Sequence, residues 1–211
     1  VVKKQRPHAL VLVGPVGIGL SALAQEYIAD TAATVITVLP EKDDKIDIEK
    51  GAITVQRIRH LYEVTRTIEP AGRVIVIDYA ERMAIPAQNA FLKLLEEPTE
   101  GTSFVLLTHQ PELLLSTIRS RVQRIDIRPI TTEQSEALLD ELHVDDVTKR
   151  TQLLFIADGR PAELVRLSRD NALFEARAAL VKDARTYITG GAYDRLLLAK
   201  KYKDTRGDAL I

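Results

Sequence analysis

A glycine-rich stretch near the amino terminus has the residue types and spacing of a phosphate-binding loop. Residues 14–21 read Gly-Pro-Val-Gly-Ile-Gly-Leu-Ser, which fits G-x-x-x-x-G-K-[ST] at every fixed position except Leu20. In such a loop, backbone N–H groups at a helix start surround a phosphate, while the lysine reaches its β- and γ-oxygens. Leu20 carries no charge, and we expect its isobutyl group to take up space that the anion needs. The remnants of the expected vestigial site are Gly14, Gly17, Gly19 and Ser21.

A second motif follows a very apolar stretch. Residues 73–77 precede Asp78, which stands where phosphate-loop ATPases place an acid that holds Mg²⁺. The next position, where a catalytic Glu would orient the attacking water, is Tyr79, and a phenol of ordinary pKa about 10 is no base near neutral pH. We expect Asp78 to belong to the vestigial nucleotide site without a working metal role. For both motifs the alternative is a turn after a strand with no ligand.

Both motifs require parallel strands to bring them together, and the first half of the chain predicts such strands. Apolar or β-branched runs alternate with helical patterns, which indicates βαβ units and a parallel sheet with helices on both faces. The expected strands are Ala9–Val13, Thr34–Leu39, Arg73–Asp78, Ser103–Thr108 and Arg121–Ile127. The expected helices cover 20–30, 54–68 (with Thr54 as the cap), 85–96 and, briefly, 111–116, and 41–51 is expected to be a loop.

After Pro129 the pattern is entirely helical. The expected helices cover 132–142, 145–158, 160–168, 172–189 and a segment from Tyr193, with Thr132 capping the first. The predicted fold class is therefore α/β, a P-loop NTPase-like parallel five-stranded sheet with flanking helices, followed by a small all-helical domain.

Composition excludes several classes of protein. The 211 residues are 45% apolar, and 29 Lys plus Arg against 30 Asp plus Glu give a net charge of -1. This balance argues against a protein that coats nucleic acid by charge alone. Without cysteine there is no disulfide, thiol nucleophile or cysteine-ligated zinc, and the four His lack metal-ligand spacing, so no metal is expected. No apolar run reaches the roughly 20 residues of a membrane span and no signal peptide is evident, so we expect a cytoplasmic protein.

Four further segments, which lie between residues 7 and 122, form an ordered set of motifs together with the glycine-rich loop. Asn89–Pro98 (NAFLKLLEEP) is close to N-A-[LF]-L-K-x-L-E-E-P, and Thr117–Val122 (TIRSRV) matches T-I-x-S-R-C except at its end. Ile53–Leu61 (ITVQRIRHL) is similar to I-x-V-D-Q-I-R-x-L, and Pro7–Leu10 to P-H-A-[LY]. Together these segments resemble the clamp-loader branch of the AAA+ ATPases. Within that branch they are most similar to the delta-prime family of bacterial DNA polymerase III, and the resemblance covers about residues 7–170.

The resemblance implies a role for Arg121, the arginine of the S-R-C motif. In this family that residue is the arginine finger, inserted into the ATP site of a neighbouring subunit. A permanently charged guanidinium from another chain can stabilise the charge of a phosphoryl group in transfer. Surface ion pairs of Arg119 and Arg121 are the alternative interpretation.

The resemblance also bears on the remaining ATPase positions. Thr108 matches a sensor position near the γ-phosphate, or else only satisfies backbone groups. Ala162 stands where active relatives have a second arginine sensor, although Arg160 and Arg166 are close by. Since Leu20 and Tyr79 are altered too, the family pattern implies a chain that does not hydrolyse ATP, with ATP bound weakly if at all and no cofactor expected. The four-cysteine zinc module of many relatives is absent, and 41–51 lies near where it could fall.

The function that the resemblance implies is that of a non-hydrolysing clamp-loader subunit of the DNA polymerase III holoenzyme. Its partners would be gamma/tau-like ATPase subunits, a delta-like subunit, indirectly the sliding clamp, and primer-template DNA within the assembled complex. The implied domains are an AAA+ α/β domain (1–128), a helical lid (129–170) and the start of a truncated helical collar (171–211). A divergent, weakly active P-loop ATPase and a nucleotide-free AAA+ scaffold outside replication are the alternatives.

Overall fold

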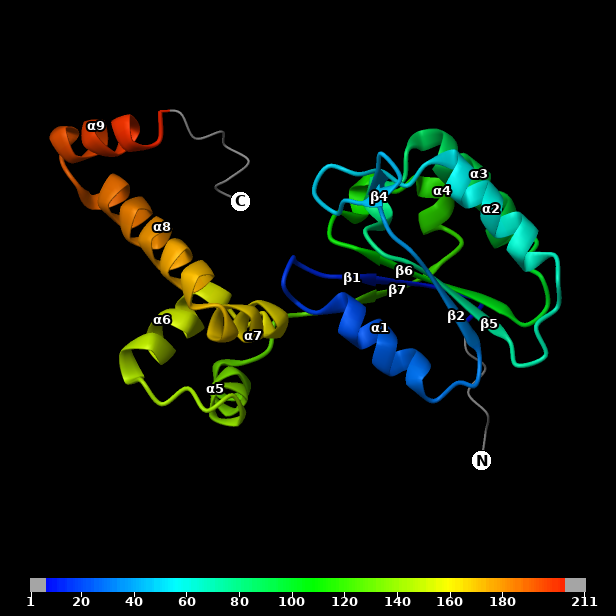
Figure 1. The fold of residues 1–211 in the computed structure, drawn as a ribbon, viewed down its shortest axis with the longest axis horizontal. Coiled ribbons are helices and arrows are strands. Elements are labelled where there is room, and N and C mark those ends of the chain that lie inside the picture. Colours follow the sequence, from blue (N-terminus) through cyan, green and yellow to red (C-terminus); the bar gives the residue numbers. More distant parts are fainter. Residues whose placement is uncertain (1–6, 204–211) are drawn as a thin grey trace. The chain divides into compact units, whose positions relative to one another are not determined.

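The computed structural model describes residues 7–203, which fall into two compact units divided between Arg128 and Pro129. The first unit is an α/β structure and the second is helical (Figure 1). The further boundary near residue 170 stays a prediction.

Five parallel strands make the sheet of the first unit, which confirms the predicted α/β fold class. Their order is β2-β5-β6-β1-β7. The strands are β1 (Ala9–Val13), β2 (Thr34–Val38), β5 (Arg73–Ile77), β6 (Thr102–Thr108) and β7 (Gln123–Asp126). In the register, Val13 at the end of β1 lies beside Thr108 on one side and Asp126 on the other.

Helices cover both faces of this sheet. They are α1 (Leu20–Ala29), α2 (Val55–Thr65), α3 (Ile85–Glu96) and α4 (Ser116–Arg119). Helices α2, α3 and α4 share one apolar cluster with the sheet, and α1 shares another on the opposite face (Figure 1). Successive strand residues alternate between the clusters, as Ile75 and Val76 do. Burial on both faces explains why these strands are almost continuously apolar in sequence.

The segment 41–51 contains a small hairpin, so the prediction of a loop alone is wrong. Strand β3 (Glu41–Lys42) pairs antiparallel with β4 (Lys45–Ile46). Asp43 and Asp44 form the turn with φ of 52° and 59°, the left-handed conformation of a tight two-residue hairpin loop. Strands of two residues are too short to produce an alternating pattern.

Arg121 precedes the fifth strand instead of opening it. The predicted short helix over 111–116 is a single 3₁₀ turn, η2 (Pro111–Leu113), followed by α4, and β7 begins only at Gln123. Arg121 therefore lies in the turn between α4 and β7, where its side chain is not part of the sheet.

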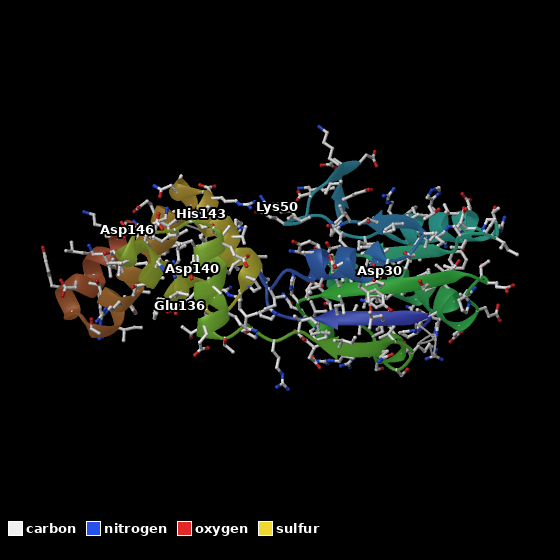
Figure 2. All side chains as sticks on the ribbon, turned by 90° about the horizontal axis from the view of Figure 1, so that it is seen from below. Asp30, Lys50, Glu136, Asp140, His143 and Asp146 are labelled. Atoms are coloured by element: carbon white, nitrogen blue, oxygen red, sulfur yellow. The ribbon has the colours of Figure 1, made fainter. Side chains whose placement is uncertain are left out.

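The second unit contains the predicted helices. They are α5 (Thr132–Glu141), α6 (Val147–Ala157), α7 (Pro161–Arg169), α8 (Asn171–Thr189) and α9 (Ala192–Lys201). Thr131, and not Thr132 as predicted, caps α5 in a capping box with Gln134. Asp146, labelled in Figure 2, caps α6 by accepting the backbone N–H of Lys149 at 2.8 Å.

The core of this unit involves α5, α6, α7 and the start of α8, where Phe174 packs. Helix α9 has no buried residue, and its large apolar side chains Leu196 and Leu197 are 69% and 50% exposed. No helix in the described part of the chain is long and apolar enough to cross a membrane.

Candidate functional site

The glycine-rich loop leaves the end of β1 and enters α1 through two residues of left-handed backbone. Gly17 and Gly19 have φ of 85° and 97°, a conformation in which a side chain would be strained. At the start of the loop, the Gly14 N–H donates to Thr108 O at 3.3 Å. A Cβ on Gly14 would lie 3.1 Å from Ile127 O. The loop therefore has the backbone form expected between a strand and a phosphate-binding helix.

Leu20, at the position of the missing lysine, packs into the interior. Its side chain is 3% exposed and belongs to the apolar cluster between α1 and the sheet. The expectation that its isobutyl group takes up phosphate space is wrong, because apolar burial draws the side chain toward Leu10 and Val76 instead. The loss at this position is thus the loss of a cation.

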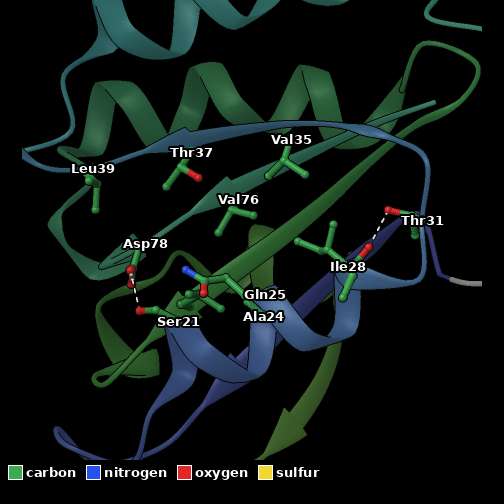
Figure 3. Close-up of a pocket in the computed structure, with 12 residues that line it drawn as sticks. Ser21, Ala24, Gln25, Ile28, Thr31, Val35, Thr37, Leu39, Val76 and Asp78 are labelled. Atoms are coloured by element: carbon green, nitrogen blue, oxygen red, sulfur yellow. Dashed lines mark hydrogen bonds between the residues drawn. The ribbon is translucent and has the colours of Figure 1, made fainter. Parts of the chain in front are cut away.

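Ser21 and Asp78 meet directly. Ser21 Oγ, on the first turn of α1, donates to Asp78 Oδ2 at 2.8 Å (Figure 3). Asp78 follows β5 and is 8% exposed, and its Oδ1 accepts the backbone N–H of Tyr79 at 2.9 Å. Both carboxylate oxygens therefore have protein donors. This is the pair that a phosphate-loop ATPase uses on Mg²⁺, and here the two side chains bind each other.

Tyr79 and His109 form a small cluster beside the loop that the sequence did not indicate. Tyr79 has left-handed backbone (φ 53°), and its ring meets the His109 ring edge-on with centroids 5.6 Å apart. His109 Nδ1 lies 2.8 Å from Gly14 O; because a carbonyl only accepts, Nδ1 carries the proton. Glu81, in the 3₁₀ turn η1 (Ala80–Arg82), accepts the His109 backbone N–H at 3.4 Å. These contacts fix the loop entrance through residues distant in sequence.

Thr108 ends β6 and is completely buried. Its Oγ1 accepts the backbone N–H of Gln110 at 3.2 Å, so it satisfies a backbone group, which is one of the two roles considered for it. Strands β5, β6 and β1 are neighbours in the sheet. Their carboxyl ends therefore bring Asp78, Thr108 and Gly14 together at one edge of the sheet, the edge at which the parallel strands end. Ligands of open parallel sheets bind at this edge.

A cavity of about 570 Å³ lies between α1 and the neighbouring strands β2 and β5. Ser21 and Asp78 lie at one end of it, and apolar side chains such as Ile28 and Val35 lie at the other (Figure 3). Within the described residues, Asp78 is the only charged group in its lining. The cavity therefore presents no cation to a polyphosphate.

Arg121 lies at the opposite edge of the sheet, where the parallel strands begin. Gln123, two residues later, starts β7 opposite Leu10 of β1, so the turn lies where the strands begin. Arg121 Nη2 pairs with Glu96 Oε1 at 2.9 Å, and the Arg121 side chain is 39% exposed. Nη1 donates to Thr117 O at 3.0 Å and to Ser120 Oγ at 3.3 Å. The structure thus includes the surface ion pair considered for Arg121, with a guanidinium still open to solvent.

Gln88 supports the segment that leads to Arg121, another role that the sequence did not indicate. It lies on α3 and is 1% exposed. Its Nε2 donates to Met83 O and Leu113 O, both at 3.1 Å, and its Oε1 accepts the Leu115 N–H at 2.8 Å. Both N–H groups of the Gln88 amide and one lone pair of its oxygen thus bind backbone groups. Through these bonds α3 fixes the segment that enters α4.

The arginines near Ala162 are engaged within the second unit. Arg160 Nε and Nη2 donate to Ala157 O and Ile156 O, both at 2.8 Å, at the carboxyl end of α6. Arg166 pairs with Glu163 at 2.7 Å. The Ala162 side chain, in the first turn of α7, is a methyl group that carries no charge for a phosphate.

Comparison with known proteins gives an independent result. The family model described as DNA polymerase III, delta subunit, matches residues 31–131. The DNA polymerase III subunit delta' of Bacillus subtilis is 36% identical over 66% of this chain and 41% of the relative. That of Pseudomonas aeruginosa is 31% identical over 88% of this chain and 63% of the relative. The chain therefore spans between two fifths and two thirds of the length of these relatives.

Solved structures support the fold. A DNA polymerase III, gamma subunit-related protein from Thermotoga maritima superposes with a TM-score of 0.51 at 18% identity, covering 97% of this chain and 77% of the other. At this identity the likeness concerns the AAA+ fold alone. The sequence matches to the family model and to both delta' subunits show that the chain belongs to the delta-prime-like clamp-loader family.

Proposed function

We propose that this chain is a clamp-loader subunit that does not hydrolyse ATP itself and supplies Arg121 to the ATP site of a neighbouring subunit. The observation that carries the proposal is the position of Arg121, whose side chain is 39% exposed at the edge of the sheet opposite the altered loop. An arginine on the surface there can enter another chain's site. It cannot reach its own loop, since a five-residue strand separates the two edges by roughly 16 Å.

The chemistry required of Arg121 is electrostatic. As a phosphoryl group passes between oxygens, negative charge spreads over its oxygens, and a planar guanidinium stabilises that charge through short N–H···O contacts. The ATP, Mg²⁺ and attacking water would belong to the partner subunit. This chain contributes a cation on a turn that Gln88 holds in place. By family, the partners would be gamma/tau-type ATPase subunits, a delta-like subunit, and clamp and primer-template DNA in the assembled holoenzyme.

The test is Arg121→Ala in a loader reconstituted with the gamma/tau-type subunit. We expect DNA-stimulated hydrolysis to fall by about 10³–10⁵-fold, the range for arginine fingers. Arg119→Ala is the matched control, since Arg119 is exposed and only two residues away, and it should leave the rate within about twofold. Unchanged hydrolysis with Arg121→Ala contradicts the proposal. Failure of the chain to bind the ATPase subunit favours a scaffold outside replication.

The Ser21–Asp78 pair favours a second candidate, a divergent ATPase with weak activity of its own. Both metal-binding side chains are retained, 2.8 Å apart. Calorimetric titration of the chain alone with Mg-ATP distinguishes the candidates. Our proposal predicts no resolved binding, whereas binding with Mg²⁺-dependent turnover that Leu20→Lys barely changes supports the alternative.

A further inference from the structure

Glu96, the last residue of α3, is the acidic partner of Arg121. The Arg121 guanidinium is bound at two ends by two different elements. Its Nη1 donates to Thr117 O, on α4, and to Ser120 Oγ, which directly precedes Arg121. Its Nη2 binds Glu96 Oε1 at 2.9 Å, and Glu96 comes from the helix that precedes β6.

The contact with Glu96 is one that a phosphate can replace. Carboxylate and phosphoryl oxygens both accept short, charge-assisted hydrogen bonds from the same N–H groups of a guanidinium. The two side chains are 39% and 48% exposed, so water and ions reach the pair. An exposed pair of this kind shifts an equilibrium by only about 1.4- to 5-fold. A nucleotide phosphate, with more charge than one carboxylate, can therefore displace Glu96.

We propose that Glu96 holds Arg121 in a resting position, and that the phosphate of a nucleotide in the neighbouring subunit takes the place of the Glu96 carboxylate on Nη2. This inference rests on the function proposed above for Arg121. Glu96 is then a positioning residue that acts through Arg121 and does not touch the nucleotide. Nη1 keeps its contacts with Thr117 and Ser120, so only one end of the guanidinium exchanges partners.

The exchange sets a competition between Glu96 and the nucleotide phosphate. Without the Glu96 charge, Arg121 is free for the phosphate in every assembled subunit, so ATP is bound more readily. The charge that Arg121 provides during phosphoryl transfer is unchanged. The consequence is a lower apparent KM for ATP with an unchanged kcat, a pattern that general loss of stability does not produce.

The first experiment measures the resting position in the full chain alone. Phenylglyoxal modifies accessible arginines, and peptide mass spectrometry reports its rate at Arg121. We expect Glu96→Gln to raise that rate about two- to fivefold, in line with loss of an exposed ion pair. Glu97→Gln, the adjacent exposed glutamate, should leave it unchanged. An equal rate in the wild type and Glu96→Gln overturns the proposal, whatever Arg121 does in a complex.

The second experiment uses the loader reconstituted with the gamma/tau-type subunit. Glu96→Gln should lower the KM for ATP about two- to fivefold and leave kcat within twofold, and Glu97→Gln should change neither. A kcat that falls with Glu96→Gln overturns the resting-position proposal, since Glu96 would then assist the reaction. If Arg121→Ala leaves kcat unchanged, the function proposed for Arg121 fails instead, and the modification rates still report on the ion pair by itself.

Discussion

At the edge where the parallel strands end, the glycine-rich loop is bound by the protein's own groups. Ser21 donates to Asp78, His109 donates to Gly14 O, and Leu20 is buried. At the edge where the strands begin, Arg121 lies on an exposed turn and pairs with an exposed glutamate. At the first edge the polar groups bind one another, while at the second a cation is exposed to solvent.

The difference distinguishes the backbone form, which the packing of the fold requires, from the single side chains on which the chemistry of a site depends. The loop retains the backbone form of phosphate binding because β1, α1 and the sheet need that connection for packing. Its charge chemistry depends on single side chains, and these can change without loss of the fold. Arg121 is exposed and pairs with Glu96, and the function proposed for it requires a contact outside the chain.

The largest effect on the folded state is expected from Gln88→Leu. It leaves Met83 O, Leu113 O and the Leu115 N–H without their side-chain partner, at about 3 kcal/mol in total. Hydrogen exchange should accelerate over 113–121, the segment that leads to Arg121, more than over 14–21. Asn89→Ala, an exposed neighbour, is the control. Equal acceleration at both edges would remove the distinction between them.

A smaller effect is expected from Ser21→Ala, which removes a hydrogen bond to the Asp78 carboxylate. Ser21 is exposed, so the free energy of unfolding should fall by only about 1 kcal/mol, measured by urea denaturation. Faster exchange should be confined to the loop. Exchange that changes over 113–121 instead would show that the two edges are coupled.

The smallest effect lies outside both edges, in the second unit. Asp183 accepts from Lys201 Nζ at 2.5 Å and from Tyr202 Oη at 2.6 Å. These hydrogen bonds, that of Lys201 first, hold the pKa of the Asp183 carboxyl below its usual 3.8. The contact between α8 and α9 is therefore fully present above that value and is lost as pH falls below it. A carboxyl ¹³C titration of Asp183 should show the lowered midpoint.

Asp183→Asn provides the matched comparison for that titration. The variant should have weaker packing of α9 at neutral pH and no further change in acid, followed by NMR shifts of α9. Changes in the loop or near Arg121 are not expected. A midpoint at or above the usual value would contradict the contact.

The sequence predicted most elements because their patterns are local. The sheet strands, α3 to its exact ends, and Thr54 as a cap follow from apolar runs and capping residues. It failed where a partner lies far along the chain: Gln88 contacts 113–115, and Glu96 contacts Arg121. The loop motif was readable in sequence, but the inward packing of Leu20 depends on the assembled core.

The central claim is that Arg121, and not the chain's own loop, serves ATP hydrolysis. Ser21→Ala and Arg121→Ala in the same reconstituted loader test it most directly, with DNA-stimulated hydrolysis as the readout. The account predicts a rate within about twofold of wild type for Ser21→Ala and a loss of about 10³-fold or more for Arg121→Ala. A large loss with Ser21→Ala and an unchanged rate with Arg121→Ala would contradict it.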